Sequence, residues 1–367
     1  MKITIFSDNV APYRIGWADE MGKTNDVTFV YTKDKDSIRN TSWLVKSSRF
    51  AKMVKLPAIV IKNRAITLNV IKYLRKNSSD IVIFDGYGPI PNMLGILYLK
   101  LKKKRYFINI DGIELNCKES KIKNFIKKMI FSKYAYFLCG SQYTVDWLKQ
   151  FGVTEEKTII HNFTSIFEKD ILEKVPADYE REEAKLKLAL KNKPTVLGVG
   201  RFIPYKQFDL LIKAFRGFDD KYQLVIIGEG IEKKNYEALI SRYGLKNVLI
   251  LDFMKFEDLK KYYLAADIFV LPATSEVWGL VVNEAMACGA LPVITSDRCI
   301  AGFSLIKNGE NGYRFSYENE DDLKDKIEEV IKNKVAMSEK SLEIIKDYTI
   351  ENTARIHIEW FNKLLIK

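Results

Sequence analysis

Two successive runs of short apolar segments, each alternating with helical patterns, constrain the fold of this 367-residue chain more than any other feature. The first run predicts strands at residues 3–6, 27–31, 81–84, 106–110 and 135–138. Helical patterns follow these strands at residues 15–21, 65–76, 92–101, 121–131 and 142–150. The second run predicts strands at residues 196–199, 224–227, 248–251, 268–271 and 291–294. Such alternation is typical of parallel sheets that are covered by helices on both faces.

We therefore predict an α/β fold with two doubly wound domains facing a cleft, in which ligands bind at the carboxyl ends of the strands. The first domain is expected to span residues 1–165 and the second residues 194–349. The charged segment 166–193 is predicted to be a linker that leads into a solvated helix. Residues from about 350 to 367 have an apolar helical pattern, and we expect this terminal helix to cross back to the first domain.

The rarity of histidine and the spacing of cysteine argue against several kinds of site. The only histidines are His161 and His357, which nearly excludes a histidine-rich metal centre and leaves few candidates for a Ser-His-Asp triad. The cysteines show no metal-ligand or disulfide spacing, which fits a reducing compartment; they are Cys117, Cys139, Cys288 and Cys299. Residues 1–8 resemble a strand rather than a signal peptide, and no apolar stretch reaches membrane-spanning length. A cytoplasmic protein is predicted.

The positive charge is concentrated in one segment. The chain has a formal charge of +12, and residues 100–133 contain eleven basic and three acidic residues. In the helix expected at 121–131, apolar residues fall at helical spacing and lysines take other positions, namely Lys121, Lys123, Lys127 and Lys128. Two interpretations stay open: a core-facing helix with a solvated charged face, or a surface that docks on an anionic membrane. Nucleic acid binding is not expected, because no stacking motif or zinc finger accompanies the charge.

A glycine turn followed by two cations opens the second domain. The strand Thr195–Val199 leads into Gly200 and Arg201, and Lys206 stands at the head of the next helical pattern. Glycine lets backbone N–H groups approach a pyrophosphate, and a helix N-terminus adds about half a positive charge. A guanidinium and an ammonium together can stabilise a departing diphosphate without a metal ion. No metal and no other cofactor is predicted.

Two glutamates eight positions apart follow downstream. Glu276 lies in a predicted loop, and Glu284 lies one helical turn beyond the start of the next helix. Between them, Gly279, Leu280 and Val281 are expected to present backbone N–H groups at the helix N-terminus. A phosphate bound there would leave Glu276 near a hexose and Glu284 near a ribose. Either glutamate alone would be an ordinary cap or surface residue, but the combination with the upstream cations indicates a sugar-nucleotide site.

Together these motifs resemble the family-4 retaining glycosyltransferases of the GT-B fold, which has two Rossmann-like domains. The resemblance covers almost the whole second domain, in the segments Gly200–Phe215, Ile226–Gly230, Glu276–Gly289 and Asn308–Gly312. In the first domain it is thinner, and Ala11–Arg14 and Ser141 resemble bacterial polysaccharide-assembly enzymes.

The resemblance implies a role for each residue of the donor site. Arg201 and Lys206 hold the donor diphosphate and neutralise the leaving group, while Glu276 contacts the transferred sugar. Glu284 contacts the ribose hydroxyls, and Asp252 and Phe253 border the nucleobase. The backbone at Gly279, Leu280 and Val281 contacts the phosphate or the sugar, and Gly200 also belongs to the donor site.

In the first domain the resemblance implies contacts with the reacting sugar and the acceptor. Where many family members have a His-Asp pair, this chain has Asn109-Ile110-Asp111, so Asp111 is the candidate residue facing the reacting sugar. A structural cap at Asp111 is the alternative. On the acceptor side the candidates are Asn9, Tyr13 and Arg14.

The resulting hypothesis is a metal-independent, retaining hexosyltransferase at the inner face of the cytoplasmic membrane. It would move a sugar from a nucleotide diphosphate, with UDP favoured, to a hydroxyl of a glycan or polyprenyl-linked oligosaccharide in bacterial surface polysaccharide synthesis. The alternatives are a soluble transferase acting on a small metabolite and a non-catalytic nucleotide-sugar-binding protein. A dinucleotide oxidoreductase is disfavoured, because Gly198-Val199-Gly200 does not continue into Gly-x-Gly-x-x-Gly.

Overall fold

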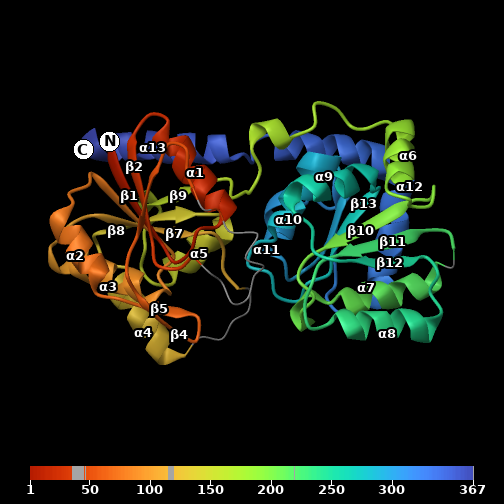
Figure 1. Ribbon diagram of the computed structural model, residues 1–367, viewed down its shortest axis with the longest axis horizontal. Coiled ribbons are helices and arrows are strands. Elements are labelled where there is room, and N and C mark those ends of the chain that lie inside the picture. Colours follow the sequence, from red (N-terminus) through yellow and green to blue (C-terminus); the bar gives the residue numbers. More distant parts are fainter. Residues whose placement is uncertain (35–44, 46, 115–119, 219, 367) are drawn as a thin grey trace. The chain divides into compact units, whose positions relative to one another are not determined.

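The computed structural model describes residues 1–34, 45, 47–114, 120–218 and 220–366. The chain divides into two compact units, each with its own sheet and helices (Figure 1). Unit 1 consists of Met1–Ser165 and Thr349–Lys367, and unit 2 is Ile166–Tyr348. One of the four cysteines, Cys117, lies outside the described residues.

Unit 1 is built on a seven-stranded parallel sheet in the order β3-β2-β1-β6-β7-β8-β9. Its central strands are apolar on both faces, as a sheet covered by helices requires. The strands are β1 (Lys2–Ser7), β2 (Asp26–Tyr31), β3 (Lys52–Lys55), β6 (Ile81–Asp85), β7 (Tyr106–Ile110), β8 (Ala135–Cys139) and β9 (Thr158–Ile160). A separate antiparallel hairpin is formed by β4 (Ile59–Ile61) and β5 (Arg64–Ile66).

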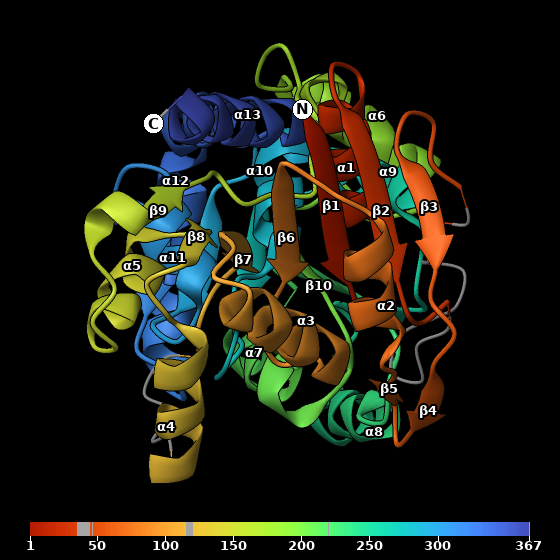
Figure 2. The same cartoon turned by 90° about the vertical axis from the view of Figure 1, so that its left-hand side faces the viewer.

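The helices of unit 1 include one that follows unit 2 in the chain. They are α1 (Pro12–Gly22), α2 (Asn69–Lys76), α3 (Ile90–Leu101), α4 (Lys121–Ile130), α5 (Gln142–Lys149), the 3-10 turn η2 (Glu155–Lys157) and α13 (Ile350–Ile366). Helix α13 packs against α1 (Figure 2). Trp17 on α1 donates its indole N–H to His357 Nδ1 at 3.0 Å, and the ring of Phe361 lies 4.9 Å from that of Phe107. These contacts complete the core of unit 1.

Unit 2 has a six-stranded parallel sheet in the order β12-β11-β10-β13-β14-β15. Its strands are β10 (Thr195–Val199), β11 (Gln223–Ile227), β12 (Val248–Leu251), β13 (Ile268–Leu271), β14 (Val293–Ser296) and β15 (Gly312–Phe315). Its helices and 3-10 turns are η3 (Glu168–Asp170), α6 (Asp178–Lys187), η4 (Pro204–Lys206), α7 (Phe208–Ala214), η5 (Phe215–Gly217), α8 (Lys233–Tyr243), α9 (Phe256–Ala265), α10 (Leu280–Gly289), α11 (Ile300–Leu305) and α12 (Glu320–Ile345). The predicted α/β class and parallel sheets are confirmed.

Helix α6 differs from the solvated helix expected in this segment. Arg181 and Lys185 are both 4% exposed. Arg181 donates to the carbonyl oxygens of Ala266 at 2.6 Å and Gly289 at 2.8 Å. Lys185 Nζ donates to Asp267 Oδ2 at 2.7 Å. The predicted helix is present and its other face is exposed, but these two charged side chains face inward because they satisfy buried carbonyl and carboxylate oxygens of unit 2.

The segment at residues 65–76 also differs from the helix predicted there. Ala65 and Ile66 belong to β5, and α2 begins only at Asn69. Thr67 Oγ1 donates to the carbonyl oxygen of Pro57 at 2.7 Å, and this bond closes the base of the hairpin. A strand of three residues is too short to give a periodic signal in the sequence.

Helix α4 is arranged differently from its predicted pattern. Lys127 is 5% exposed, and its Nζ lies 4.5 Å from the ring centroid of Trp147, so it does not join the charged face. Ile122 and Phe125, expected on the buried face, are 73% and 69% exposed. The aromatic side chains around Lys127 stabilise the cation by their electron-rich faces. Lys121, Lys123 and Lys128 remain on the exposed surface. Within the described part of the chain, no helix is both long and apolar enough to cross a membrane.

The carboxylate of Asp267 should make one of the largest single contributions to the stability of unit 2. It is 3% exposed and accepts hydrogen bonds from Lys185 Nζ, Lys334 Nζ and the N–H of Thr195 at 2.7–2.8 Å. Asp267→Ala should lower the free energy of unfolding by about 3–5 kcal/mol, because it leaves buried Lys185 without a counter-charge. Urea denaturation followed by circular dichroism measures this loss. The matched control Asp220→Ala removes an exposed carboxylate that pairs with two lysines and should leave the midpoint unchanged.

Candidate functional site

Two loops at the carboxyl ends of neighbouring strands β10 and β13 meet in unit 2. Lys206, 8% exposed at the end of η4, contacts the carboxylate of Glu276 through its Nζ. The N–H of Thr274 donates to the carbonyl oxygen of Tyr205 at 2.9 Å, which joins the two loops through their backbones. The structure thus brings together two residues predicted for one site although they lie 70 positions apart.

The backbone at Gly279 explains why glycine stands between the two glutamates. Gly279 caps α10 in the left-handed region, with φ 100° and ψ 65°, and no side chain caps the helix. A Cβ atom at this position would lie 2.9 Å from Leu271 Cδ2 and 3.3 Å from Glu276 Cγ. The turn therefore requires glycine, and it sets the first N–H groups of α10, at Leu280 and Val281, beside Glu276.

The glycine turn after β10 is held by a close approach of two backbones. A Cβ atom at Gly228, after β11, would lie 1.9 Å from the carbonyl oxygen of Gly200. Arg201 follows at once and donates from Nη2 to the hydroxyl of Tyr205 at 2.6 Å. Tyr205 was not predicted as a site residue. It orients the guanidinium and lies next to Lys206, so both cations come from one short loop.

Glu284 is fixed by a residue that sequence reasoning missed. Tyr263 on α9 is fully buried and donates its hydroxyl to Glu284 Oε2 at 3.0 Å. Burial raises the pKa of Tyr263 well above its ordinary value, and the neighbouring Glu284 carboxylate raises it further. The hydroxyl therefore remains a donor at every physiological pH. No motif connects Tyr263 to Glu284, because the contact depends on how α9 packs against α10.

Asp252 and Phe253 lie after β12, two strands away from β10 in the sheet. The side chain of Asp252 is 80% exposed and forms an ion pair with Lys233 Nζ at 2.5 Å, while Phe253 is partly buried. These two residues stand at the same edge of the sheet as the Lys206–Glu276 contact. An exposed carboxylate and an aromatic ring therefore lie two strands away from Arg201 and Lys206 in the sheet.

A second polar cluster lies at the carboxyl ends of β6 and β7 in unit 1. Arg14 is 6% exposed, contacts the carboxylate of Asp111 and lies 2.7 Å from Asp85 Oδ1. Asn109 Nδ2 donates to Asp85 Oδ1 and to Asp111 Oδ1, both at 3.0 Å. The predicted residues Arg14 and Asp111 are thus brought together. Asp85 was missed, although it ends the strand beside β7 just as Asp111 follows β7.

Burial and the charges of Arg14 and the two aspartates together determine the electrostatics of this cluster. Burial opposes the charge on Arg14, but Asp111 and Asp85 outweigh it and raise the pKa of the guanidinium. Burial raises the pKa of Asp111, Arg14 counteracts this, and the like charge of Asp85 adds to the rise. Of the other acceptor-side candidates, Tyr13 packs its ring 5.7 Å from that of Phe163, and Asn9 is partly buried in the turn between β1 and α1.

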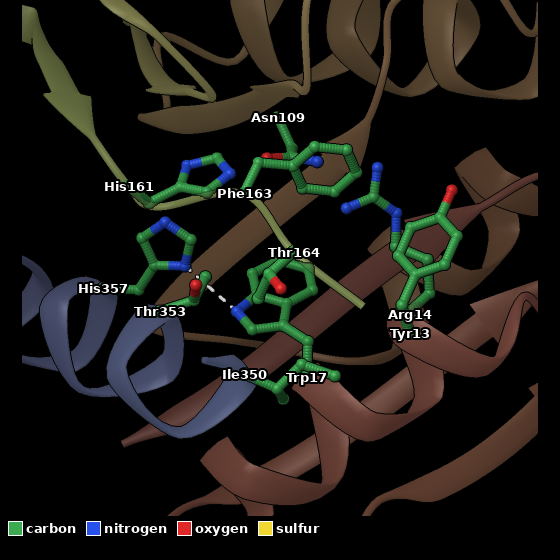
Figure 3. Close-up of a pocket in the computed structure, with 10 residues that line it drawn as sticks. All are labelled: Tyr13, Arg14, Trp17, Asn109, His161, Phe163, Thr164, Ile350, Thr353 and His357. Atoms are coloured by element: carbon green, nitrogen blue, oxygen red, sulfur yellow. Dashed lines mark hydrogen bonds between the residues drawn. The ribbon is translucent and has the colours of Figure 1, made fainter. Parts of the chain in front are cut away.

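Behind Arg14 lies a small cavity lined by both apolar and polar side chains (Figure 3). It encloses about 10 Å³, which is room for about one water molecule. The rings of His161 and His357 line it with centroids 4.7 Å apart, and among the described residues neither His161 Nδ1 nor His357 Nε2 has a hydrogen-bond partner. Burial lowers the pKa of His357 to about 3, with a further contribution from Arg14. Burial, His357 and Arg14 together hold the pKa of His161 well below its ordinary value.

Neither cluster has the composition of a metal site. Among the residues that the structure describes, no group of three or more histidine, cysteine, aspartate or glutamate side chains is placed to hold a metal ion. The charged groups of the unit 2 site are instead a lysine, an arginine and two glutamates. Such a set can bind an anion and accept hydrogen bonds from hydroxyl groups.

The part of the chain that contains the unit 2 site is similar to known proteins. Residues 180–351 match the protein family described as Glycosyl transferases group 1. An uncharacterized glycosyltransferase of Haemophilus influenzae is 33% identical over 184 residues, which cover 48% of this chain and 50% of that protein. A relative from Campylobacter jejuni is named N-acetylgalactosamine-N,N'-diacetylbacillosaminyl-diphospho-undecaprenol 4-alpha-N-acetylgalactosaminyltransferase. It is 26% identical over 239 residues, which cover 62% of this chain and 61% of the relative.

The chain spans about half the length of the first curated relatives that it matches. Solved structures match over nearly the whole chain. HepE of Anabaena, solved in complex with UDP, aligns with a TM-score of 0.79 at 16% identity and covers 99% of this chain and 100% of its own. This likeness confirms the predicted GT-B fold, and the family match confirms the resemblance inferred from the sequence motifs.

The two buried histidines should make unit 1 sensitive to acid. The unfolded chain binds a proton at each histidine near pH 6.5, whereas folded His357 does so only near its pKa of about 3. The unfolded state therefore binds more protons in this window, and the free energy of unfolding should fall as the pH is lowered from 6.5. The expected slope is about 1.4 kcal/mol per pH unit for each histidine.

Urea denaturation between pH 7.5 and pH 4.5 measures the slope, and His357→Gln should reduce it by the share of one histidine. Equal slopes in the parent and the variant would show that His357 is charged in the folded protein.

Proposed function

Because residues 180–351 form a domain of the group 1 glycosyltransferase family, we propose that this protein transfers a sugar from a nucleotide diphosphate to a hydroxyl group of a glycan or lipid-linked oligosaccharide. The observation that carries the proposal is the contact between Lys206 and Glu276 beside the start of α10. In this proposal the enzyme is a retaining hexosyltransferase that acts without a metal ion.

The donor diphosphate would bind between the two loops of unit 2. Lys206 and Arg201 would donate to its oxygens, and the first N–H groups of α10 would add the partial positive charge of a helix N-terminus. When the diphosphate replaces Glu276 as the ion-pair partner of Lys206, the Glu276 carboxylate becomes available to accept a hydrogen bond from a sugar hydroxyl. Glu284, oriented by Tyr263, would accept from the ribose hydroxyls. Asp252 and Phe253 would border the nucleobase.

Charge stabilisation would contribute most of the catalysis. As the bond from the sugar C1 atom to the phosphate oxygen breaks, negative charge grows on the diphosphate, where Arg201 and Lys206 lie. The departing diphosphate can take the proton of the acceptor hydroxyl on the same face of the sugar, so the new bond forms with retained configuration. Asp111, which Arg14 and Asn109 orient, would contact the reacting sugar.

Two observations support the nature of the donor and the acceptor. HepE, which shares the fold, was solved with UDP, and this favours a UDP-sugar. The name of the Campylobacter relative contains a diphospho-undecaprenol acceptor, which favours a lipid-linked acceptor at the inner face of a bacterial membrane and a role in surface polysaccharide synthesis. Exposed Lys121, Lys123 and Lys128 on α4 would then face anionic lipid, each contributing at most about 1 kcal/mol.

The first test is the release of free nucleotide diphosphate from a panel of nucleotide sugars, followed by variants at the two cations. With the best donor, Arg201→Ala and Lys206→Ala should each lower turnover by about 10²-fold, because each removes charge stabilisation that grows in the transition state. Lys213→Ala is the matched control, since this lysine lies one helix further on and pairs with Asp209. Turnover of both site variants at the level of the control would refute the proposed site.

Metal independence has its own test. Turnover should persist in excess EDTA, since in this proposal Arg201 and Lys206 replace a divalent ion in neutralising the diphosphate. The assay is repeated with the best donor after dialysis against the chelator. A loss that added magnesium restores would assign the neutralisation to a metal ion.

A further inference from the structure

The β4–β5 hairpin of unit 1 exposes an unusual amount of apolar surface. Ile59, Val60 and Ile61 are 70%, 51% and 55% exposed, and Ile66 on the paired strand is 43% exposed. Leu68, directly after the hairpin, is 65% exposed. Isolated apolar side chains on a surface are ordinary, but four exposed ones on one short hairpin, with a fifth directly after it, are typical of a binding surface.

The hairpin is held in this conformation rather than left loose. Lys62 and Asn63 form its two-residue turn with φ angles of 46° and 61°. The carbonyl oxygen of Asn63 accepts a hydrogen bond from the buried Lys33 Nζ at 2.8 Å. At the base, the carbonyl oxygen of Pro57 accepts from Thr67 Oγ1 and Asn69 Nδ2 at 2.7 and 2.8 Å. Polar bonds at both ends therefore fix the apolar side chains outward.

The segment of sequence that contains the hairpin carries basic charge only. Residues 51–79 contain seven basic residues and no acidic residue. Lys62 at the turn and Arg64 on β5 are both exposed between the apolar side chains. Two copies of this chain meeting through the same hairpin would bring these like charges together, which opposes self-association. An anionic partner with an apolar interior fits both features.

Helix α4 presents the same combination at the same end of unit 1. Ile122 and Phe125 are exposed on α4, with Lys121, Lys123 and Lys128 beside them. In both views α4 and the β4–β5 hairpin lie at the lower end of unit 1, and Figure 2 shows them at opposite sides of that end (Figures 1 and 2). Two apolar and basic elements at one end indicate a broad surface rather than a pocket.

We propose that the β4–β5 hairpin inserts its apolar side chains into the headgroup region of an anionic lipid bilayer, as a contact separate from α4. The proposal rests on the proposed function, since a lipid-linked acceptor gives such docking its purpose. Lys33 also forms an ion pair with Asp8 Oδ2 at 2.6 Å, next to the acceptor-side residue Asn9. One buried side chain thus connects the inserted hairpin to the turn proposed to bind the acceptor.

The test compares vesicle binding of the full chain with that of two matched double variants. Ile59→Ser with Ile61→Ser removes the apolar tip, and the control Leu186→Ser with Ile231→Ser removes two side chains of unit 2 that are each 79% exposed. Vesicles contain phosphatidylcholine alone or with one third phosphatidylglycerol. The hairpin variant should bind the anionic vesicles at least tenfold more weakly than the parent, the control should bind like the parent, and high salt should weaken binding of all three. Thermal unfolding verifies that both variants fold.

Equal binding of the hairpin variant and the parent would overturn the proposal, as would equal losses in both double variants. The proposal would also be overturned if the parent is a dimer and the hairpin variant is a monomer that binds vesicles as well as the parent. That result would identify the hairpin as a protein interface. Release of nucleotide diphosphate in solution is measured in parallel and should be unchanged in both variants. If the parent releases no nucleotide diphosphate from any donor, the transferase function is refuted. The vesicle experiment then still tests whether the hairpin binds lipid.

Discussion

The buried carboxylate of Asp267 joins the starts of β10 and β13, the two strands whose following loops form the Lys206–Glu276 contact. Its Oδ2 accepts from the N–H of Thr195 at the start of β10, and its own N–H donates to the carbonyl oxygen of Thr195. Lys185 and Lys334 complete its partners from helices α6 and α12. Because β10 and β13 are fixed at this end, the loops at their other ends are also fixed in register. The contact of Lys206 with Glu276 is therefore a consequence of packing some distance away.

That contact also balances charge within the proposed site. An anion-binding site must collect positive charge, and unbalanced charges in a partly buried loop repel one another. Glu276 balances Lys206, and the two side chains are 16% and 10% exposed. In the proposed function, a donor diphosphate would replace Glu276 as the partner of Lys206 instead of neutralising an isolated cation. The cost of removing the ammonium from water has already been met during folding.

The sequence predicted the features that depend on local pattern and missed those that depend on packing. The alternation of strands and helices gave the α/β fold, because each parallel strand is a continuous apolar run. The glycine turn, the two cations and the glutamate spacing indicated the loops after β10 and β13, which the structure brings together, because these features are also local in the sequence. The hydrogen bond from Tyr263 to Glu284 has no local signal, since it joins two helices. The helical pattern places Lys127 on the charged face of α4, but its ammonium packs against Trp147 of another helix. Asp85 joins the Arg14 cluster only because β6 lies beside β7, where Asn109 donates to it.

Helix α13 gives unit 1 a particular order of assembly. Its His357 accepts the indole N–H of Trp17, and its Phe361 packs on Phe107 of the central sheet, yet it follows all of unit 2 in the chain. During synthesis the ribosome therefore delivers every residue of unit 2 before unit 1 can close its core. Unit 2 is the one contiguous folding unit of the two, and the apolar face of α1 remains without α13 until nearly the whole chain has been synthesised. Nascent-chain chaperones would meet that face first.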